Sequence, residues 1–176
     1  MAWELIDKRV LYDGRRMRLE IHEIRDEATG ARQSKEVVAH PGAVIVLPGV
    51  ADGRVVMIRN KRGTGGKYLG GLPAGTLEKS EPPINCAGRE LLEETGYLAG
   101  RMKPLISFYT SPGILSELMH AFVATELQLK RAHPEEGEEI EVIVVSMEEA
   151  MGMIREGEIK DGKTIAVLLT YDKFGR

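Results

Sequence analysis

The sequence contains very little cysteine and has no long apolar run. Only one of its 176 residues is cysteine, Cys86, so no disulfide can form within the chain. No apolar stretch approaches the ~20 residues that cross a bilayer, and the charged N-terminal residues predict no signal peptide. These absences predict a reduced protein in the cytoplasm with no membrane partner.

The sequence also lacks an excess of basic charge. It has 24 basic and 27 acidic residues, a formal net charge of −3, and its few aromatic residues do not interleave with basic ones. This composition predicts no nucleic-acid partner. The four histidines have no metal-ligand spacing, and neither a Gly-x-Gly-x-x-Gly fingerprint nor a P-loop occurs. Dinucleotide-binding and P-loop proteins are therefore excluded.

Hydrophobic patterning predicts a sheet-rich middle of the chain. Residues 16–22 alternate polar and apolar, as in a half-buried strand that follows a turn at Asp13-Gly14. Residues 42–47 form a continuous apolar run, typical of a strand covered on both faces, and residues 54–59 are expected to be its hairpin partner across Asp52-Gly53. Two further strands are predicted at residues 118–124 and 140–145.

Three helices are predicted, which together with the strands indicate an α/β class. The first begins at Pro82-Pro83 and ends at Gly96. The second covers residues 146–157, with a capping box formed by Ser146 and Glu149 and a C-cap at Gly157. A weaker helical pattern follows in residues 161–171. Residues 1–40 are predicted to form a separate strand-rich appendage.

The first predicted helix carries three closely spaced carboxylates and only one adjacent arginine. Glu90 faces both Glu93 and Glu94 on one helical side. Like charges ~6 Å apart repel by roughly 3 kcal/mol at an effective dielectric of ~20. Arg89 can pair with Glu93 but does not neutralise all three. Either this face is simply solvated, or it binds hard divalent cations, which prefer carboxylate oxygens.

The spacing around these carboxylates favours the cation site. Residues 75–97 read GTLEKSEPPINCAGRELLEETGY. The residues that define the pattern, at fixed but unequal intervals, are Gly75, Glu81, Arg89-Glu90, Glu93-Glu94 and Gly96. This pattern resembles the Nudix box, the signature of hydrolases that cleave a nucleoside diphosphate linked to another group. Tyr97 departs from it, since the family usually has an aliphatic residue there.

The resemblance implies a fold and a metal site. The fold is an α/β/α sandwich with a mixed sheet, with residues 41–176 as the Nudix domain and residues 1–40 as a small antiparallel β subdomain. Glu90, Glu94 and the backbone carbonyl of Ala74 would bind two or three Mg²⁺ or Mn²⁺ ions, and Glu93 would bridge a metal or hold a water. Arg89 would orient the carboxylates and pair with Glu81.

Features outside the box resemble the ADP-ribose pyrophosphatase branch. Leu-Pro-Ala-Gly leads into the box, Pro112 follows Gly96 by sixteen residues, and residues 35–44 are similar to the segment that enters the central sheet in that branch. The implied reaction is hydrolysis of ADP-ribose to AMP and ribose 5-phosphate, by a homodimer that associates through its N-terminal strands. Gly71, where the branch has glutamate, and residues 63–66 depart from the pattern.

The same resemblance suggests further site residues. A loop glutamate would activate the attacking water, with Glu136 first and Glu138 second. Arg62 would contact the diphosphate, and Pro112 and Glu117 would lie at the substrate. Each has an ordinary alternative: a solvated acidic loop, a solvated cation or a common turn. Two alternative functions also stay open, hydrolysis of another nucleoside diphosphate sugar such as GDP-mannose, and non-catalytic regulation through nucleotide binding.

Overall fold

The computed structural model describes residues 2–14, 17–61, 68–130 and 140–175. The chain divides into two compact units. The first comprises Met1–Gly42 with Tyr109–Leu118, and the second comprises Ala43–Phe108 with Met119–Arg176. Within the described residues, no helix has the length and apolar character needed to cross a membrane.

The first unit is built on a three-stranded antiparallel sheet in the order β1-β2-β3. A turn in which the Gly14 N–H donates to the Met17 carbonyl separates the first two strands. The strand predicted at residues 16–22 is therefore confirmed, although it runs further toward the C-terminus. The strands are β1 (Trp3–Asp13), β2 (Arg18–Asp26) and β3 (Arg32–Ala39).

A buried carboxylate lies at the middle of this sheet. Glu20 is only 1% exposed, whereas the neighbouring Leu19 and Ile21 are half-buried. Its side chain contacts Lys8, Arg18 and His22 at 3.1, 2.8 and 2.7 Å. The hydrogen bond with His22, more than the two cations, holds the pKa of Glu20 below its usual value despite burial. Period-two alternation alone predicts a solvated side chain at this position.

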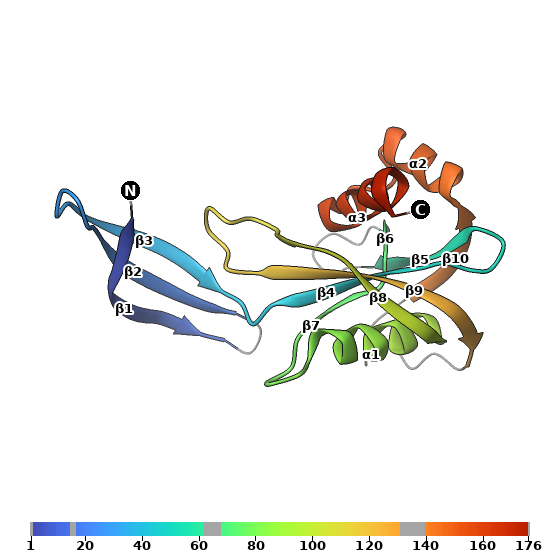
Figure 1. Ribbon diagram of the computed structural model, residues 1–176, viewed down its shortest axis with the longest axis horizontal. Coiled ribbons are helices and arrows are strands. Elements are labelled where there is room, and N and C mark those ends of the chain that lie inside the picture. The colour runs from blue at the N-terminus through green and yellow to red at the C-terminus, as the bar shows by residue number, and fades with distance from the viewer. Residues whose placement is uncertain (1, 15–16, 62–67, 131–139, 176) are drawn as a thin grey trace. The chain divides into compact units, whose positions relative to one another are not determined.

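The second unit is organised around β4, all six of whose residues are buried. Because side chains alternate along a strand, Val44 and Val46 pack into a cluster with α1, while Ile45 and Leu47 pack into the cluster under α2 and α3. Figure 1 shows α1 on one side of the sheets and α2 and α3 on the other. The α/β/α layering with a mixed sheet that the sequence predicts is confirmed.

The strands of this unit form two sheets. One has the order β7-β4-β9-β8, with β4 parallel to β9 and antiparallel to β7, and the other has the order β10-β5-β6. The strands are β4 (Ala43–Pro48), β5 (Arg54–Lys61), β6 (Tyr68–Gly71), β7 (Ala74–Thr76), β8 (Tyr97–Tyr109), β9 (Leu118–Leu129) and β10 (Ile140–Ser146).

The predicted hairpin between residues 42–47 and 54–59 is wrong. Both segments are strands, but β5 pairs with β10 and β6, and only an isolated bridge between Gly49 and Val55 links the ends of β4 and β5. The physical reason is that β7 and β9 already occupy both edges of β4. The Asp52-Gly53 turn therefore carries the chain from one sheet to the other.

The three helices lie where the sequence predicts them. The αL conformation of Gly96 (φ 74°) ends α1, and its N–H donates to the Leu92 carbonyl. The capping box of Ser146 and Glu149 opens α2, while its C-cap is Glu156 and the left-handed Gly157 comes one residue later. Asp161 caps α3. The helices are α1 (Pro83–Thr95), α2 (Met147–Arg155) and α3 (Gly162–Phe174).

Candidate metal centre and active site

The buried face of α1 determines which of its glutamates points toward the sheet. Cys86, Ala87 and Leu91 are completely buried against β4. Glu94 follows Leu91 by three residues and therefore lies on the same helical face, where it is 5% exposed. The Ala74 N–H on β7 donates to its Oε2 at 2.9 Å. This hydrogen bond fixes a buried carboxylate against the backbone of β7.

The Glu90 side chain contacts Gly75, the residue that follows Ala74 in β7. A Cβ atom built on Gly75 would come within 1.9 Å of both Cδ and Oε1 of Glu90, so the carboxylate lies in the space that a side chain would need. The first glycine of the motif is therefore required for a close approach to a side chain. The carboxylates of Glu90 and Glu94 thus contact two consecutive residues of β7.

Arg89 joins the remaining carboxylates of the motif. Its guanidinium makes a bidentate pair with Glu81, in which Nε and Nη2 each donate at 3.1 Å. Nη1 donates to Glu90 at 2.7 Å and to Glu93 at 3.0 Å. These contacts raise the pKa of Arg89, with the hydrogen bond to Glu81 the largest cause, and they lower the pKa of Glu81 to about 2. A permanent positive charge therefore holds three carboxylates in place.

Cys86 packs beneath this cluster. It is fully buried, and its Sγ lies 3.2 Å from Nη2 of Arg89. Burial raises the pKa of the thiol to about 12, since desolvation outweighs the attraction of the arginine. Cys86 therefore acts as a small buried residue beneath the ion-pair cluster.

The donor set at β7 and α1 fits a hard divalent cation. It consists of carboxylate oxygens and backbone groups, which Mg²⁺ and Mn²⁺ prefer. In the described part of the chain no group of three or more His, Cys, Asp or Glu side chains is arranged to hold a metal ion. The structure places two carboxylates, those of Glu90 and Glu94, against β7, where Gly75 has no side chain.

The other predicted site residues fall into two groups. Arg62, Glu136 and Glu138 lie outside the described residues. Pro112 and Glu117 belong to the first unit, whereas the metal motif belongs to the second. Pro112 is exposed, and Glu117 accepts a hydrogen bond from the Thr110 hydroxyl at 2.6 Å and lies 3.5 Å from Nδ1 of His40. Their roles stay predictions.

One buried polar residue of the second unit was not predicted. Asn60 is 8% exposed and lines a cavity in the second unit together with Gly70 and Gly71. The signal that could have pointed to it is the pair of adjacent glycines inside a strand, which often marks a close approach to a ligand or to another backbone.

Comparison with known proteins relates the chain to one family. The NUDIX domain matches residues 39–168. An ADP-ribose pyrophosphatase of Bacillus subtilis (strain 168) is 36% identical over 161 residues, 90% of this chain and 86% of that protein. A methanol dehydrogenase activator of Bacillus methanolicus is 38% identical over 157 residues, 88% of this chain and 84% of that protein.

A third relative and a solved structure complete these matches. A GDP-mannose pyrophosphatase of Escherichia coli O1:K1 / APEC is 36% identical over 168 residues, 86% of each chain. A crystal structure of an ADP compounds hydrolase superposes with a TM-score of 0.84 at 20% identity, covering 99% of this chain and 94% of that one. At that identity the likeness concerns the fold alone.

Proposed function

The chain belongs to the Nudix family, and we propose that it hydrolyses the diphosphate of ADP-ribose, or of a related ADP-sugar, to AMP and a sugar phosphate. From ADP-ribose the second product is ribose 5-phosphate. The observation that carries the proposal is the meeting of Glu90 and Glu94 with the Ala74–Gly75 backbone of β7. The Bacillus subtilis ADP-ribose pyrophosphatase, with its long alignment, supports the substrate.

We assign the metal site to Glu90, Glu94 and the carbonyl of Ala74, and Glu93 would bridge a metal or hold a water. Two or three Mg²⁺ or Mn²⁺ ions fit this donor set of hard oxygens. When bound, such ions polarise the diphosphate, lower the pKa of a coordinated water and stabilise the leaving phosphate. The chain itself provides carboxylates that are already held in place, one by the Ala74 N–H and one by Arg89.

Arg89 is a positioning residue in this proposal. It donates to Glu90 and Glu93 while its other nitrogens are fixed by Glu81. A lysine could not do this, because one ammonium cannot present the planar pair of donors that Glu81 accepts. Arg89 therefore sets the direction in which the two glutamates present their oxygens.

The general base in this proposal is a glutamate in the acidic segment that precedes β10. Glu136 takes a proton from the attacking water or positions it, and Glu138 is the second candidate. Arg62 contacts the diphosphate, and Pro112 and Glu117 contact the substrate. These five assignments rest on sequence position and on the resemblance to the family.

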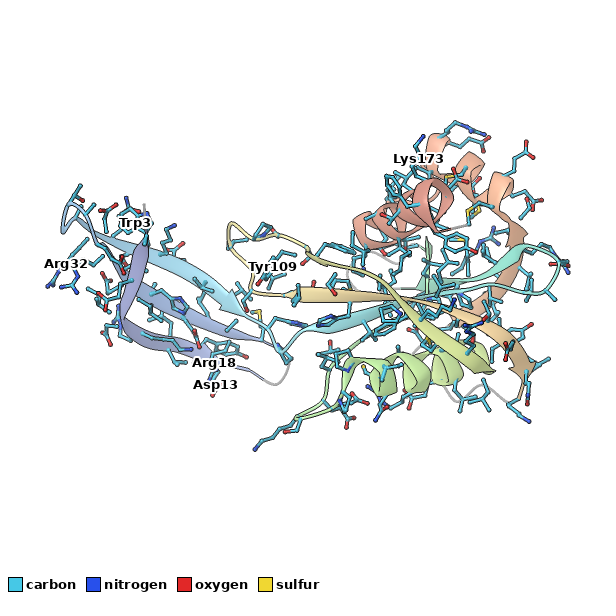
Figure 2. The ribbon with its side chains drawn as sticks, viewed as in Figure 1. Trp3, Asp13, Arg18, Arg32, Tyr109 and Lys173 are labelled. Atoms are coloured by element: carbon cyan, nitrogen blue, oxygen red, sulfur yellow. The ribbon has the colours of Figure 1, made fainter. Side chains whose placement is uncertain are left out.

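A homodimer through the N-terminal strands is also part of the proposal. Every described residue of β1 is exposed, including several large apolar ones, whereas such side chains are normally buried in a monomer. Figure 2 shows Trp3 at the start of this strand. Sedimentation should give twice the chain mass, and Leu11→Asp should give the monomer mass. The exposed apolar residues of β1 are Trp3, Leu5, Ile6, Val10, Leu11 and Tyr12.

Two other functions have support from named relatives. The Escherichia coli GDP-mannose pyrophosphatase supports a different nucleoside diphosphate sugar as substrate. The methanol dehydrogenase activator supports a regulatory role. The complete set of motif glutamates argues for a catalytic protein, because a regulator that had lost catalysis has no need to keep them. A cytoplasmic location stays a prediction.

The deciding experiment measures Mg²⁺-dependent product release from ADP-ribose, GDP-mannose and a nucleoside triphosphate panel. The proposal expects the highest kcat/KM for ADP-ribose, and no preference over the other compounds would refute the substrate. Replacing both Glu90 and Glu94 by glutamine should abolish turnover. Glu148→Gln, an exposed residue on α2, is the matched control and should leave turnover unchanged.

A further inference from the structure

The guanidinium of Arg89 has five N–H groups, and five acceptors lie within hydrogen-bond distance of it. Four of these acceptors are carboxylate oxygens of the motif. The fifth is the sulfur of Cys86, which lies 3.2 Å from Nη2. One donor of the arginine is therefore directed at a neutral side chain. The four oxygens are Oε1 and Oε2 of Glu81, Oε1 of Glu90 and Oε2 of Glu93.

Donors and acceptors also match nitrogen by nitrogen. Nε has one hydrogen and donates to Glu81. Nη1 has two hydrogens and donates to Glu90 and Glu93. Nη2 has two hydrogens and donates to Glu81 and Cys86. Because the guanidinium is planar and rigid, its five N–H directions are fixed together, and a rotation that breaks one contact disturbs the others.

The Cys86 contact lies on the buried side of the arginine. Cys86 precedes Arg89 by three residues, so the two side chains are neighbours on α1. The Arg89 side chain is 27% exposed, whereas Cys86 has no exposed surface and packs with Ala87 and Leu91 against β4. Bulk water reaches part of the guanidinium but not the sulfur. The Nη2 hydrogen on this side therefore depends on the sulfur as its acceptor.

The thiol also connects α1 to β7, which runs beside it in Figure 1. The Sγ–H group donates to the carbonyl of Thr76 at 3.6 Å, and Thr76 follows Gly75 in β7. Burial, supported by the nearby carboxylate of Glu81, raises the pKa of the thiol to about 12, so the sulfur keeps its hydrogen. It donates that hydrogen to the strand while its lone pairs accept from Arg89.

An apolar residue at position 86 would remove both contacts. One Nη2 hydrogen would then face the buried side chains of Ala87 and Leu91 without an acceptor. Leaving a charged donor unpaired in such a place costs more free energy than the hydrogen bond itself contributes. The guanidinium would turn toward solvent, and its contacts with Glu90 and Glu93 would change with it.

We propose that Cys86 is a positioning residue for the metal site, whose sulfur holds the guanidinium of Arg89 in the orientation that serves Glu90 and Glu93. The inference rests on the proposed function and deepens it, because it adds a neutral thiol to the groups that fix the proposed ligands. A residue that merely fills space beneath the cluster would respond differently to substitution. Three substitutions of Cys86 separate the two roles.

The test compares Cys86→Ser, Cys86→Ala and Cys86→Val with the wild type. Serine keeps one donor and one acceptor, whereas alanine and valine keep neither. Hydrolysis of ADP-ribose gives kcat, KM and the Mg²⁺ concentration for half-maximal rate. The alanine and valine variants should need about tenfold more Mg²⁺ and have a lower kcat, with a smaller change in KM. Cys86→Ser should stay within about threefold of the wild type in each quantity.

A space-filling role predicts the reverse order. Valine, which is apolar and close to cysteine in size, would then be the best replacement, and serine would be the worst because it buries a hydroxyl group. That order, or equal Mg²⁺ requirements in all four proteins, would overturn the proposal.

The matched control is Val46→Ala on β4, which removes apolar contacts from the same buried cluster. It should lower Tm but leave the Mg²⁺ requirement within about twofold of the wild type. If Val46→Ala raises the requirement as much as Cys86→Ala does, loss of packing is the cause and the proposal is wrong.

A measurement without substrate or metal separates this inference from the proposed function. Exchange of the Arg89 Nε–H with solvent is followed by NMR, and the resonance is assigned by its loss in Arg89→Lys. Exchange should be at least about fivefold faster in Cys86→Ala and Cys86→Val than in the wild type and Cys86→Ser. If the wild type does not hydrolyse ADP-ribose, the proposed function fails, but this comparison still decides the role of Cys86. Equal exchange rates in all four proteins would refute it.

Discussion

The carboxylate of Glu90 lies in the space that a side chain at position 75 would occupy. The distance from a Cβ on Gly75 to Glu90 Oε1 would be 1.9 Å, far inside van der Waals contact. Since β7 is paired with β4, the strand cannot retreat, and the glutamate must move instead. The position of the Glu90 carboxylate, one of the proposed metal ligands, thus depends on the absence of a Cβ atom on the neighbouring strand.

Gly75→Ala should therefore lower kcat/KM at least about a hundredfold, because displacing a ligating carboxylate removes much of the metal site. The measurement is steady-state hydrolysis of ADP-ribose over a range of Mg²⁺ concentrations. The control is Gly88→Ala on α1, where a new Cβ meets nothing within 4 Å. That variant should keep its activity and gain about 1 kcal/mol in free energy of unfolding. Full activity in Gly75→Ala would contradict the geometry.

The helix that carries the site could be predicted because its signals are local. Prolines at its start, a glycine at its end and carboxylates three and four residues apart all lie within one short segment. The residues that these carboxylates contact could not be derived from that segment. Glu94 binds Ala74, twenty residues away, and Glu90 meets Gly75; only the resemblance to a known family pointed to Ala74.

Sheet partners were the least predictable part of the fold. The turn at Asp52-Gly53 correctly separates two strands, but a turn does not determine whether its flanking strands pair with each other. β4 does not pair with β5 because β7 and β9 are hydrogen-bonded to its two edges. The strand β8 went unpredicted since Gly100, Pro104 and scattered basic residues interrupt its alternation. Burial of Glu20 likewise depends on partners from its own sheet, Lys8, Arg18 and His22, which the local pattern around Glu20 does not reveal.

Divalent cations should stabilise the folded protein. A ligand that binds only the native state raises the free energy of unfolding by about 2.7 kcal/mol at a hundredfold excess over Kd. Mg²⁺ or Mn²⁺ added to EDTA-treated protein should therefore raise Tm by several degrees. The shift should disappear in the variant with glutamine at Glu90 and Glu94, and persist in Glu148→Gln. An equal shift in all three proteins would mean that the cation binds elsewhere.

Acid should weaken the motif through Glu81. Hydrogen bonds from Arg89 lower the pKa of this carboxyl from 4.5 to about 2. A group with a lowered pKa in the folded state adds stability that is complete above its unfolded pKa and is lost as the pH falls toward the folded one. Glu81 therefore stabilises the fold fully above about pH 5 and progressively less between pH 5 and pH 2.

The variant Glu81→Gln isolates this contribution. At pH 7 and without metal it should be less stable than the wild type by about 1–3 kcal/mol, since one pKa unit corresponds to ~1.4 kcal/mol. The difference should shrink as the pH falls from 5 to 2. Urea unfolding at a series of pH values measures it, with Glu148→Gln as the control. A difference that is the same at pH 7 and pH 3 would show that the ion pair with Arg89 is not its source.

The single thiol should be unreactive in the native protein. Cys86 has no exposed surface, and burial raises its pKa to about 12, so almost no thiolate is present at neutral pH. A disulfide reagent such as dithionitrobenzoate should label it at the rate of unfolding, and labelling should become fast and stoichiometric in concentrated urea. Cys86→Ala, which should give no signal in either condition, controls for non-specific reaction. Fast labelling of the folded protein would show that α1 leaves β4 far more often than its buried contacts with Val44 and Val46 allow.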